Sequence, residues 1–366
     1  MAAKHLGKER PIRLGEQSAG RSVRQGMGDR ASSARHRRVL AGAFVATLLT
    51  VQAPCGLAQE LGAVEKNGAR SSLEGELVTE VPIELVGRML VVPVELRGQT
   101  LRFLLDTGAT LGAVTRSVAR RLGLKPVGHA KLSGASGQAR VPVVETRLMR
   151  LGDARAGKWE KYLLNDEILA HDDQHRFDGI VGSDLLRYYD VLIDAPARVL
   201  RLYKRGTTGT NGGPVVGREE AVSFDRIRSG IIRFPVSVNG STIDAILDSG
   251  SPALLLNPSA ADATGVELTE QPLSDDPRGI GRGTVQTYGT RIDSIDVGTV
   301  RLEALGGEMA DLPIFGQLGL GDRPAMLVGS PFFLRCALLI SWAARELRFC
   351  RQPVLAAAAP WGQSRR

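Results

Sequence analysis

Residues 104–109 read LLDTGA, and residues 246–251 read ILDSGS. In each hexapeptide an apolar strand ends on an aspartate, Asp106 or Asp248, that is followed by a small hydroxyl residue and a glycine. A single Asp-Thr-Gly is also ordinary turn chemistry and would predict little. Two copies at equivalent points of an internal repeat indicate that the two aspartates belong to one site.

The repeat extends well beyond the two hexapeptides. At a shift of 142 residues the register holds from Pro93, which falls on Pro235, to Gly123. A later block repeats at a shift of 147, where residues 181–183 and 328–330 both read VGS. An insertion of five residues in the second half accounts for the difference between the two shifts. The chain is therefore predicted to hold two copies of one unit of roughly 130 residues, too long for a solenoid repeat.

Length and charge constrain the domain organisation and the partners. The 366 residues suffice for two domains with cores of their own. Of the formal charge of +8, residues 1–58 carry +7, so the other 308 residues carry only +1. A surface that binds nucleic acid would need an excess of positive charge in the folded part of the chain, so no nucleic-acid partner is expected. The expected segments are a basic leader with signal peptide (1–58), a linker (59–78), an N-terminal lobe (79–205), a Gly/Thr-rich linker (206–220), a C-terminal lobe (221–351) and a disordered tail (352–366).

The leader is typical of an export signal. Four basic residues, 35–38, precede thirteen mostly apolar and uncharged residues, 39–51, and small residues then lead to a cut before Gln59. Thirteen residues are short for a bilayer, so a permanent anchor is the weaker alternative. The sequence therefore predicts an exported protein, periplasmic or secreted, without a permanent membrane span.

Two cysteines remain after removal of the leader, Cys336 and Cys350. They flank a candidate hairpin whose turn is centred near Ala343, so antiparallel pairing would place them opposite one another. Because export permits oxidation, a Cys336–Cys350 disulfide is predicted, and two buried free thiols remain the alternative. A cysteine nucleophile is disfavoured, since neither residue has a histidine nearby in sequence.

Short strands separated by turn residues predict a mainly β architecture. Strands are expected over 91–96 and 101–105, and a short helix over 113–122, ended by Gly123. Residues 179–203 are expected to form an apolar strand, a glycine, a helical turn and a hairpin. Residues 159–170 fit either a helix or a strand.

The ordered combination of these features resembles the aspartic proteases of the pepsin/retropepsin fold, and most of all their bacterial retropepsin-like members. The features are the two aspartate hexapeptides, the apolar-apolar-glycine segments 180–182 and 327–329, and a Gly-rich hairpin between them in each unit. The resemblance implies two pseudo-twofold-related, β-barrel-like lobes with an active-site cleft between them. It also implies that each apolar-apolar-glycine strand crosses beneath the aspartate loop of its own lobe.

The chemistry of the family requires two carboxyl groups in one site. Carboxylates held roughly 3 Å apart share one proton, so one can take a proton from water while the other polarises a peptide carbonyl. Asp106 and Asp248 are the predicted catalytic pair. We assign loop support to Thr107 and Ser249, whose hydroxyls can tie each loop to the other's backbone, to the close-approaching Gly108 and Gly250, and to Ser251, which unlike Ala109 can hydrogen-bond a carboxylate oxygen.

The Gly-rich hairpins are candidate flaps over a substrate, with simple loops as the alternative. Their tips are Gly134, Ala135, Ser136 and Gly137 in the first unit and Gly281, Arg282 and Gly283 in the second. His171 and His175 lie four residues apart, but an exposed polar loop explains them better than a metal site does, and neither a metal nor a cofactor is expected.

The function predicted from the sequence is that of an exported aspartic endopeptidase. It would act on peptide or protein substrates as a monomer with pseudo-twofold symmetry. A catalytically silent relative that binds peptides or a protein partner in the same cleft remains the alternative.

Overall fold

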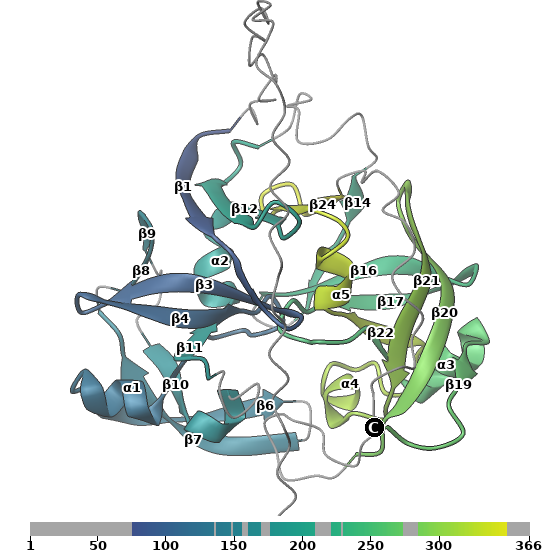
Figure 1. Cartoon of the computed structure of the whole chain (residues 1–366), viewed down its shortest axis with the longest axis horizontal. Coiled ribbons are helices and arrows are strands. Elements are labelled where there is room, and N and C mark those ends of the chain that lie inside the picture. The colour runs from purple at the N-terminus through teal and green to yellow at the C-terminus, as the bar shows by residue number, and fades with distance from the viewer. Residues whose placement is uncertain are drawn as a thin grey trace, which may run out of the picture. The chain divides into compact units, whose positions relative to one another are not determined.

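The structure is a computed structural model that describes residues 75–134, 137–147, 149–155, 160–169, 176–208, 221–227, 230–273 and 285–349. All of these residues lie in one unit, Asn67–Arg366. Most of them form short β-strands arranged in three sheets (Figure 1). The chain is therefore mainly β, as its short strands and frequent turn residues predict.

A ten-stranded sheet forms the N-terminal lobe. At its centre, β4 (Gln99–Leu105) pairs antiparallel with β3 (Met89–Leu96) and parallel with β11 (Gly179–Val181). The other strands, in sheet order, are β6 (Pro126–Gly134), β7 (Gly137–Glu145), β10 (Glu160–Leu164) and β5 (Ala113–Thr115) on the β11 side, with β2 (Glu84–Val86), β8 (Arg150–Leu151) and β9 (Ala154–Arg155) on the β3 side.

An eight-stranded sheet with the same centre forms the C-terminal lobe. Here β17 (Ser241–Leu247) pairs antiparallel with β16 (Ile231–Val238) and parallel with β22 (Ala325–Val328). Because β20 also pairs with β16, the sheet closes on itself as a barrel does. The remaining strands are β15 (Asp225–Ile227), β18 (Leu255–Leu256), β19 (Glu267–Leu268), β20 (Tyr288–Val297) and β21 (Val300–Met309).

The third sheet joins the two lobes and carries their pseudo-twofold axis. Its central strands are β12 (Tyr189–Asp194) and β23 (Leu338–Ser341), which pair antiparallel with Leu192 opposite Leu339. These two leucines are also equivalent positions at the shift of 147, so the axis passes between them. The outer strands are β1 (Leu77–Pro82) and β13 (Val199–Lys204) from the first lobe, and β24 (Glu346–Phe349) and β14 (Val222–Ser223) from the second.

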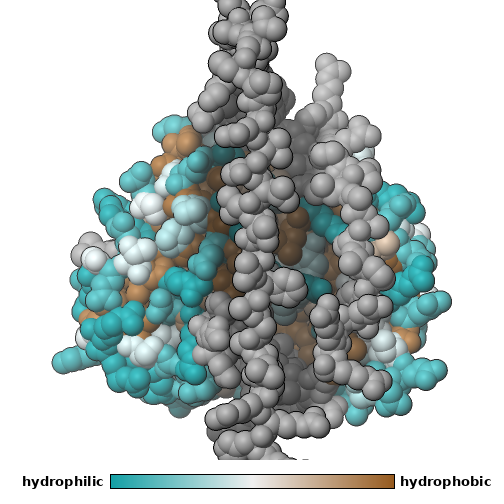
Figure 2. Space-filling model, in the orientation of Figure 1, coloured by the Kyte–Doolittle hydropathy of each residue, from teal (hydrophilic) through white to brown (hydrophobic). Residues whose placement is uncertain are grey.

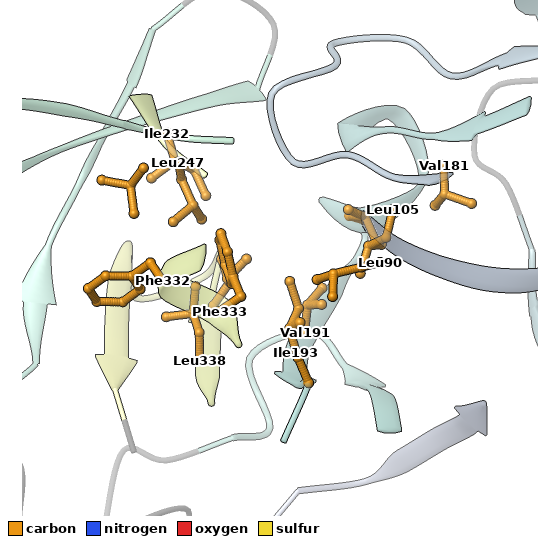
Figure 3. Close-up of a cluster of buried hydrophobic side chains, with 14 of the residues drawn as sticks. Leu90, Leu105, Val181, Val191, Ile193, Ile232, Leu247, Phe332, Phe333 and Leu338 are labelled. Atoms are coloured by element: carbon orange, nitrogen blue, oxygen red, sulfur yellow. The ribbon is translucent and has the colours of Figure 1, made fainter. Parts of the chain in front are cut away.

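One buried hydrophobic cluster runs through both lobes and the sheet that joins them. Figure 3 shows Leu105 and Val181 of the first lobe and Leu247 and Phe332 of the second in this single cluster, with side chains of β12 between them. Hydrophilic residues cover the outer flanks of the described face (Figure 2). A shared core fixes the lobes relative to each other, since separating them would expose apolar surface.

The helices are short, and two of them are capped by side chains at equivalent positions of the repeat. Thr115 caps α1 (Arg116–Arg121) and Asn257 caps α3 (Pro258–Thr264); each accepts a hydrogen bond from the N–H three residues on, Val118 at 3.4 Å and Ala260 at 2.8 Å. The other helices are η1 (Asp166–Leu169), α2 (Ser183–Leu186), α4 (Pro313–Gln317) and α5 (Ser330–Phe333).

One sequence-based expectation for local structure needs correction, and one ambiguous segment is resolved. The helix expected over 113–122 begins only at Arg116, because Ala113–Thr115 form β5 and pair with β10 and β11. The ambiguous segment 159–170 contains both a strand, β10, and a 3-10 turn, η1.

The hairpin that carries the cysteines is offset by one residue from its expected register. Leu338 lies opposite Phe349, and Ser341 opposite Glu346, so the turn is centred between Ala343 and its successor rather than on Ala343. The turn has an even number of residues between the strands and includes Arg345 in a left-handed conformation, with φ of 58°. Cys336 is buried ahead of β23, whereas Cys350 lies outside the described residues, so the disulfide stays a prediction.

Candidate active site

Each aspartate is held by the end of its central strand. Asp106 follows β4 and donates its N–H to the Val181 carbonyl at 3.0 Å, and Asp248 follows β17 and donates to the Val328 carbonyl at 3.1 Å. The two acceptors end β11 and β22, the apolar strands that run parallel to β4 and β17. These are the apolar-apolar-glycine segments, which therefore support the aspartate loops of their own lobes.

The two aspartate loops are hydrogen-bonded to each other through Thr107 and Ser249. The Thr107 N–H donates to the Ser249 Oγ, and the Ser249 N–H donates to the Thr107 Oγ1, both at 3.0 Å. Each hydroxyl in turn donates across the axis, Thr107 to the Leu247 carbonyl at 3.1 Å and Ser249 to the Leu105 carbonyl at 2.8 Å. Both side chains are buried, so these four bonds form a network in which every partner is satisfied.

Gly108 and Gly250 let each loop reach the carboxyl group of the opposite lobe. A β-carbon on Gly108 would stand 2.7 Å from the Asp248 Cγ, and one on Gly250 would stand 2.4 Å from the Asp106 Cγ. Any side chain at either position would push the two carboxyl groups apart. The sequence predicted these glycines as points of close approach, and the structure adds that the approach crosses the axis.

The Asp106 and Asp248 carboxyl groups are hydrogen-bonded to each other and to backbone N–H groups. Ala109 donates to the Asp106 Oδ1 at 2.9 Å, and Gly250 donates to the Asp248 Oδ1 at 3.1 Å. Burial raises the pKa of Asp106 well above its ordinary value, and the nearby Asp248 charge raises it further. Burial also raises the pKa of Asp248, against the effect of its hydrogen bonds. A pair in this setting retains one proton at a pH where separate carboxyl groups have lost theirs.

The prediction that the Ser251 hydroxyl hydrogen-bonds a carboxylate oxygen is wrong. Its Oγ donates to the Ala253 carbonyl at 3.0 Å within its own turn. The Ser251 backbone N–H is the group that hydrogen-bonds the Asp248 side chain. Ala109 supplies the equivalent N–H in the first loop, so the difference between alanine and serine leaves this support of the carboxylates unchanged.

Sequence reasoning missed a buried ion pair beneath the first aspartate loop. Lys161 of β10 and Asp184 of α2 form a salt bridge, and their side chains are 0% and 1% exposed. Asp184 also accepts the Gly112 N–H at 2.8 Å, which anchors the chain just past the loop. The signal was the polar pair Ser183-Asp184 inside an otherwise apolar repeat block, but nothing in the sequence identified Lys161 as its partner.

A second support that was missed is Ser183, the residue after the glycine of the first apolar-apolar-glycine segment. Its buried hydroxyl lies 3.2 Å from the carbonyl oxygens of Thr107 and of Gly230 in the second lobe. It therefore links the first aspartate loop to the other lobe. The recurrence of Val-Gly-Ser in both units was the sequence signal for it.

An apolar cluster lies beside the aspartate loop in each lobe. The first apolar cluster includes Leu104, Ala113 and Ile180, and Ala109 packs against it. The second apolar cluster includes Ile246, Leu255 and Leu327, which are the pseudo-twofold equivalents of those three residues. The members of both clusters are buried, and partly buried apolar side chains pack against them, so each aspartate loop is flanked by apolar side chains.

Of the flap candidates, the structure describes only part. Strands β6 and β7 form an antiparallel hairpin that ends with Gly134 opposite Gly137, and β6 contacts α4 of the C-terminal lobe. Ala135 and Ser136 at its tip lie outside the described residues, as do Gly281, Arg282 and Gly283. His171 and His175 lie outside them as well, and no group of three or more metal-ligating side chains occurs among the residues described.

Comparisons with known proteins address the same two segments. The sequence profile of a family described as aspartyl protease matches residues 92–185 and 234–332, together more than half of the chain. A crystal structure of aspartic proteinase from Irpex lacteus is similar with a TM-score of 0.46 and 13% identity, covering 74% of this chain and 96% of that one. The search of curated proteins gave no match. Each profile match contains one aspartate loop and the apolar-apolar-glycine strand beneath it, and the chain belongs to the aspartyl protease family.

Proposed function

We propose that the protein is an exported aspartic endopeptidase in which Asp106 and Asp248 activate water to hydrolyse a peptide bond. The observation that carries the proposal is the contact of the two carboxyl groups, held by loops that hydrogen-bond across the pseudo-twofold axis. The apolar cluster on each side of the pair supports an extended peptide as the substrate.

In the proposed reaction the pair carries one proton throughout. The ionised carboxylate takes a proton from water as the water oxygen bonds to the peptide carbonyl carbon, and the protonated carboxyl gives its proton to the carbonyl oxygen. When the intermediate collapses, one hydroxyl proton passes to the ionised carboxylate, and the carboxyl group that already held a proton gives it to the leaving nitrogen as the C–N bond breaks. The products are a carboxylic acid and an amine, and the pair again carries one proton. The pair titrates as a unit, so neither aspartate has a fixed role as acid or base.

A peptide-library digest between pH 3 and 8, with sequencing of the products, tests the activity. Asp106→Asn and Asp248→Asn should each lower cleavage about 10⁴-fold or more, because neither carboxyl group works alone. Asp293→Asn is the matched control, since that side chain is 73% exposed and distant in sequence from both loops. Cleavage that persists in Asp106→Asn would contradict the proposal, and peptide binding without cleavage by the wild type would favour a silent relative.

Export is proposed on the leader alone, which lies outside the described residues. Among the residues that are described, no helix has the length and apolarity needed to cross a membrane. The proposal predicts a mature protein that begins at Gln59 and is found in the periplasmic or secreted fraction. A mature chain that retains residues 39–51 would point to a membrane anchor instead.

A further inference from the structure

Tyr162 and Glu308 occupy equivalent positions in the two lobes. Tyr162 of β10 lies opposite Ala113 in a parallel pair, and Glu308 of β21 lies opposite Leu255, the equivalent of Ala113. The backbone bonds agree: the Tyr162 N–H donates to the Gly112 carbonyl at 3.0 Å, and the Glu308 N–H donates to the equivalent Leu254 carbonyl at 2.8 Å. Each residue is therefore in the strand next to the segment that follows its lobe's aspartate loop.

The two side chains have different surroundings. Tyr162 packs against the first apolar cluster, and its hydroxyl is hydrogen-bonded to the Thr110 side chain. The second lobe has Pro252 at the place of Thr110, so no hydroxyl is present there to bond a polar group. One lobe thus pairs a threonine with a tyrosine, and the other pairs a proline with a glutamate.

The Glu308 carboxylate is half-buried and without a hydrogen bond or ion pair among the described residues. Burial raises its pKa, and the charge that opposes this effect is Arg88, in the turn between β2 and β3 of the first lobe. Arg88 is exposed and is not within salt-bridge distance, so it does not satisfy the carboxylate. A half-buried carboxylate without a partner is costly, and this cost is typical of groups that meet a ligand.

The side of the sheet on which the Glu308 side chain lies indicates which ligand it meets. Paired residues of parallel strands project on the same side of the sheet, so Glu308 lies on the side of Leu255 and the second apolar cluster. A carboxylate set in that apolar surface would be satisfied by a cationic side chain whose aliphatic stem covers the surrounding apolar atoms.

We propose that Glu308 binds the lysine or arginine side chain of a peptide on the C-terminal-lobe side of the aspartate pair, while Tyr162 and the first apolar cluster bind an apolar side chain on the other. The protein would thus select substrates with a basic residue on one side of the cleaved bond and an apolar residue on the other. This inference rests on the proposed use of the aspartate pair as the site of peptide binding.

Binding of non-cleavable peptides tests the inference independently of catalysis. The probes are hexapeptides in which a hydroxyethylene group replaces the central peptide bond, with phenylalanine on one side of it and lysine or norleucine on the other, made in both orders. Norleucine keeps the apolar stem of lysine and lacks its charge. In one of the two orders, calorimetry should show the wild type binding the lysine peptide about 10- to 100-fold more tightly, as expected for a charge-assisted hydrogen bond.

Four variants separate the role of Glu308 from general effects. Glu308→Gln should bind both peptides equally, and Glu308→Lys should prefer a glutamate peptide. Glu303→Gln, at an exposed position of the same strand, should keep the preference for lysine. Arg88→Met should strengthen this preference, because it removes a competing cation.

The outcomes of this test and of the proposed function can be distinguished. A wild type without a preference for lysine, or a preference that survives in Glu308→Gln, overturns the inference, and so does failure to bind either peptide. Cleavage of the corresponding ordinary peptides without such a preference would leave the proposed protease activity standing. A preference for lysine without cleavage would leave the inference standing and refute the activity.

Discussion

Gly250 lies directly against the Asp106 carboxyl group, although the two residues belong to different lobes. A β-carbon on Gly250 would stand 2.4 Å from the Asp106 Cγ, closer than real β-carbons approach any atom. The contact means that the separation of the two carboxyl groups is set by the lack of a side chain at this position. Gly108 has the same relationship to Asp248.

Gly250→Ala should therefore lower the rate of cleavage strongly while the protein remains folded. The methyl group would displace Asp106 by about 1 Å, a shift that can cost roughly 10²-fold or more in rate when reacting groups must stay aligned. The measurement is kcat/KM on any peptide that the wild type cuts. Gly316→Ala is the control, since a β-carbon there has no atom within 4 Å, and it should leave the rate unchanged.

The cross-lobe network predicts strong coupling between Thr107 and Ser249. Thr107→Val and Ser249→Ala should each lower the free energy of unfolding by about 1–3 kcal/mol, because each leaves buried backbone groups without partners. The double variant should lose clearly less than the sum of the two, since both single changes break the same bonds. Additive losses in urea denaturation would argue against a shared network.

Stability should depend on pH through the aspartate pair. The pKa of Asp106 is raised in the folded protein, so its protonated form favours folding below the ordinary value of 3.8, and that contribution is lost as the pH rises through the raised value. Replacing Asp106 with asparagine removes this loss. The Tm of Asp106→Asn relative to wild type should therefore increase as the pH is raised from 4 to 7, whereas a constant difference would show that the pair does not retain its proton.

Replacing only one partner of the buried Lys161–Asp184 ion pair should destabilise the protein strongly. Lys161→Met should lower the free energy of unfolding by about 3–5 kcal/mol, because it leaves the Asp184 charge buried without its cation. Adding Asp184→Asn should recover part of the loss, since an amide oxygen still accepts the Gly112 N–H without a charge. The comparison of the three proteins by denaturation checks this order, and an equally unstable double variant would contradict it.

The sequence was sufficient to predict how the aspartate loops are built, because the residues that form each loop are adjacent in the chain. Asp106, Thr107 and Gly108 are adjacent, and their equivalents recur at one fixed shift, so the hydroxyl links across the axis could be predicted from residue type. The same holds for the strand, glycine and helical turn at residues 179–186. In each case the same pattern occurs in both units of the repeat, which strengthened the prediction.

The features that the sequence did not reveal depend on partners distant along the chain. Lys161 and Asp184 are 23 residues apart and lie in different elements. Ala113–Thr115 have a helical pattern continuing after them, but two neighbouring strands hold them in the sheet. The exchange of Thr110 for Pro252 also depends on a distant partner, because Thr110 bonds Tyr162, at the position where the second lobe has Glu308.

The pseudo-twofold axis between Leu192 and Leu339 has a consequence for how a peptide would be oriented. A peptide chain has a direction, whereas a site with perfect twofold symmetry presents the same surface to both directions and would hold a substrate either way round. Tyr162 on one side and Glu308 on the other remove that equivalence. A peptide with one apolar and one basic neighbour to its central bond would then fit in a single orientation, so the unlike pair would set the polarity of the bound chain.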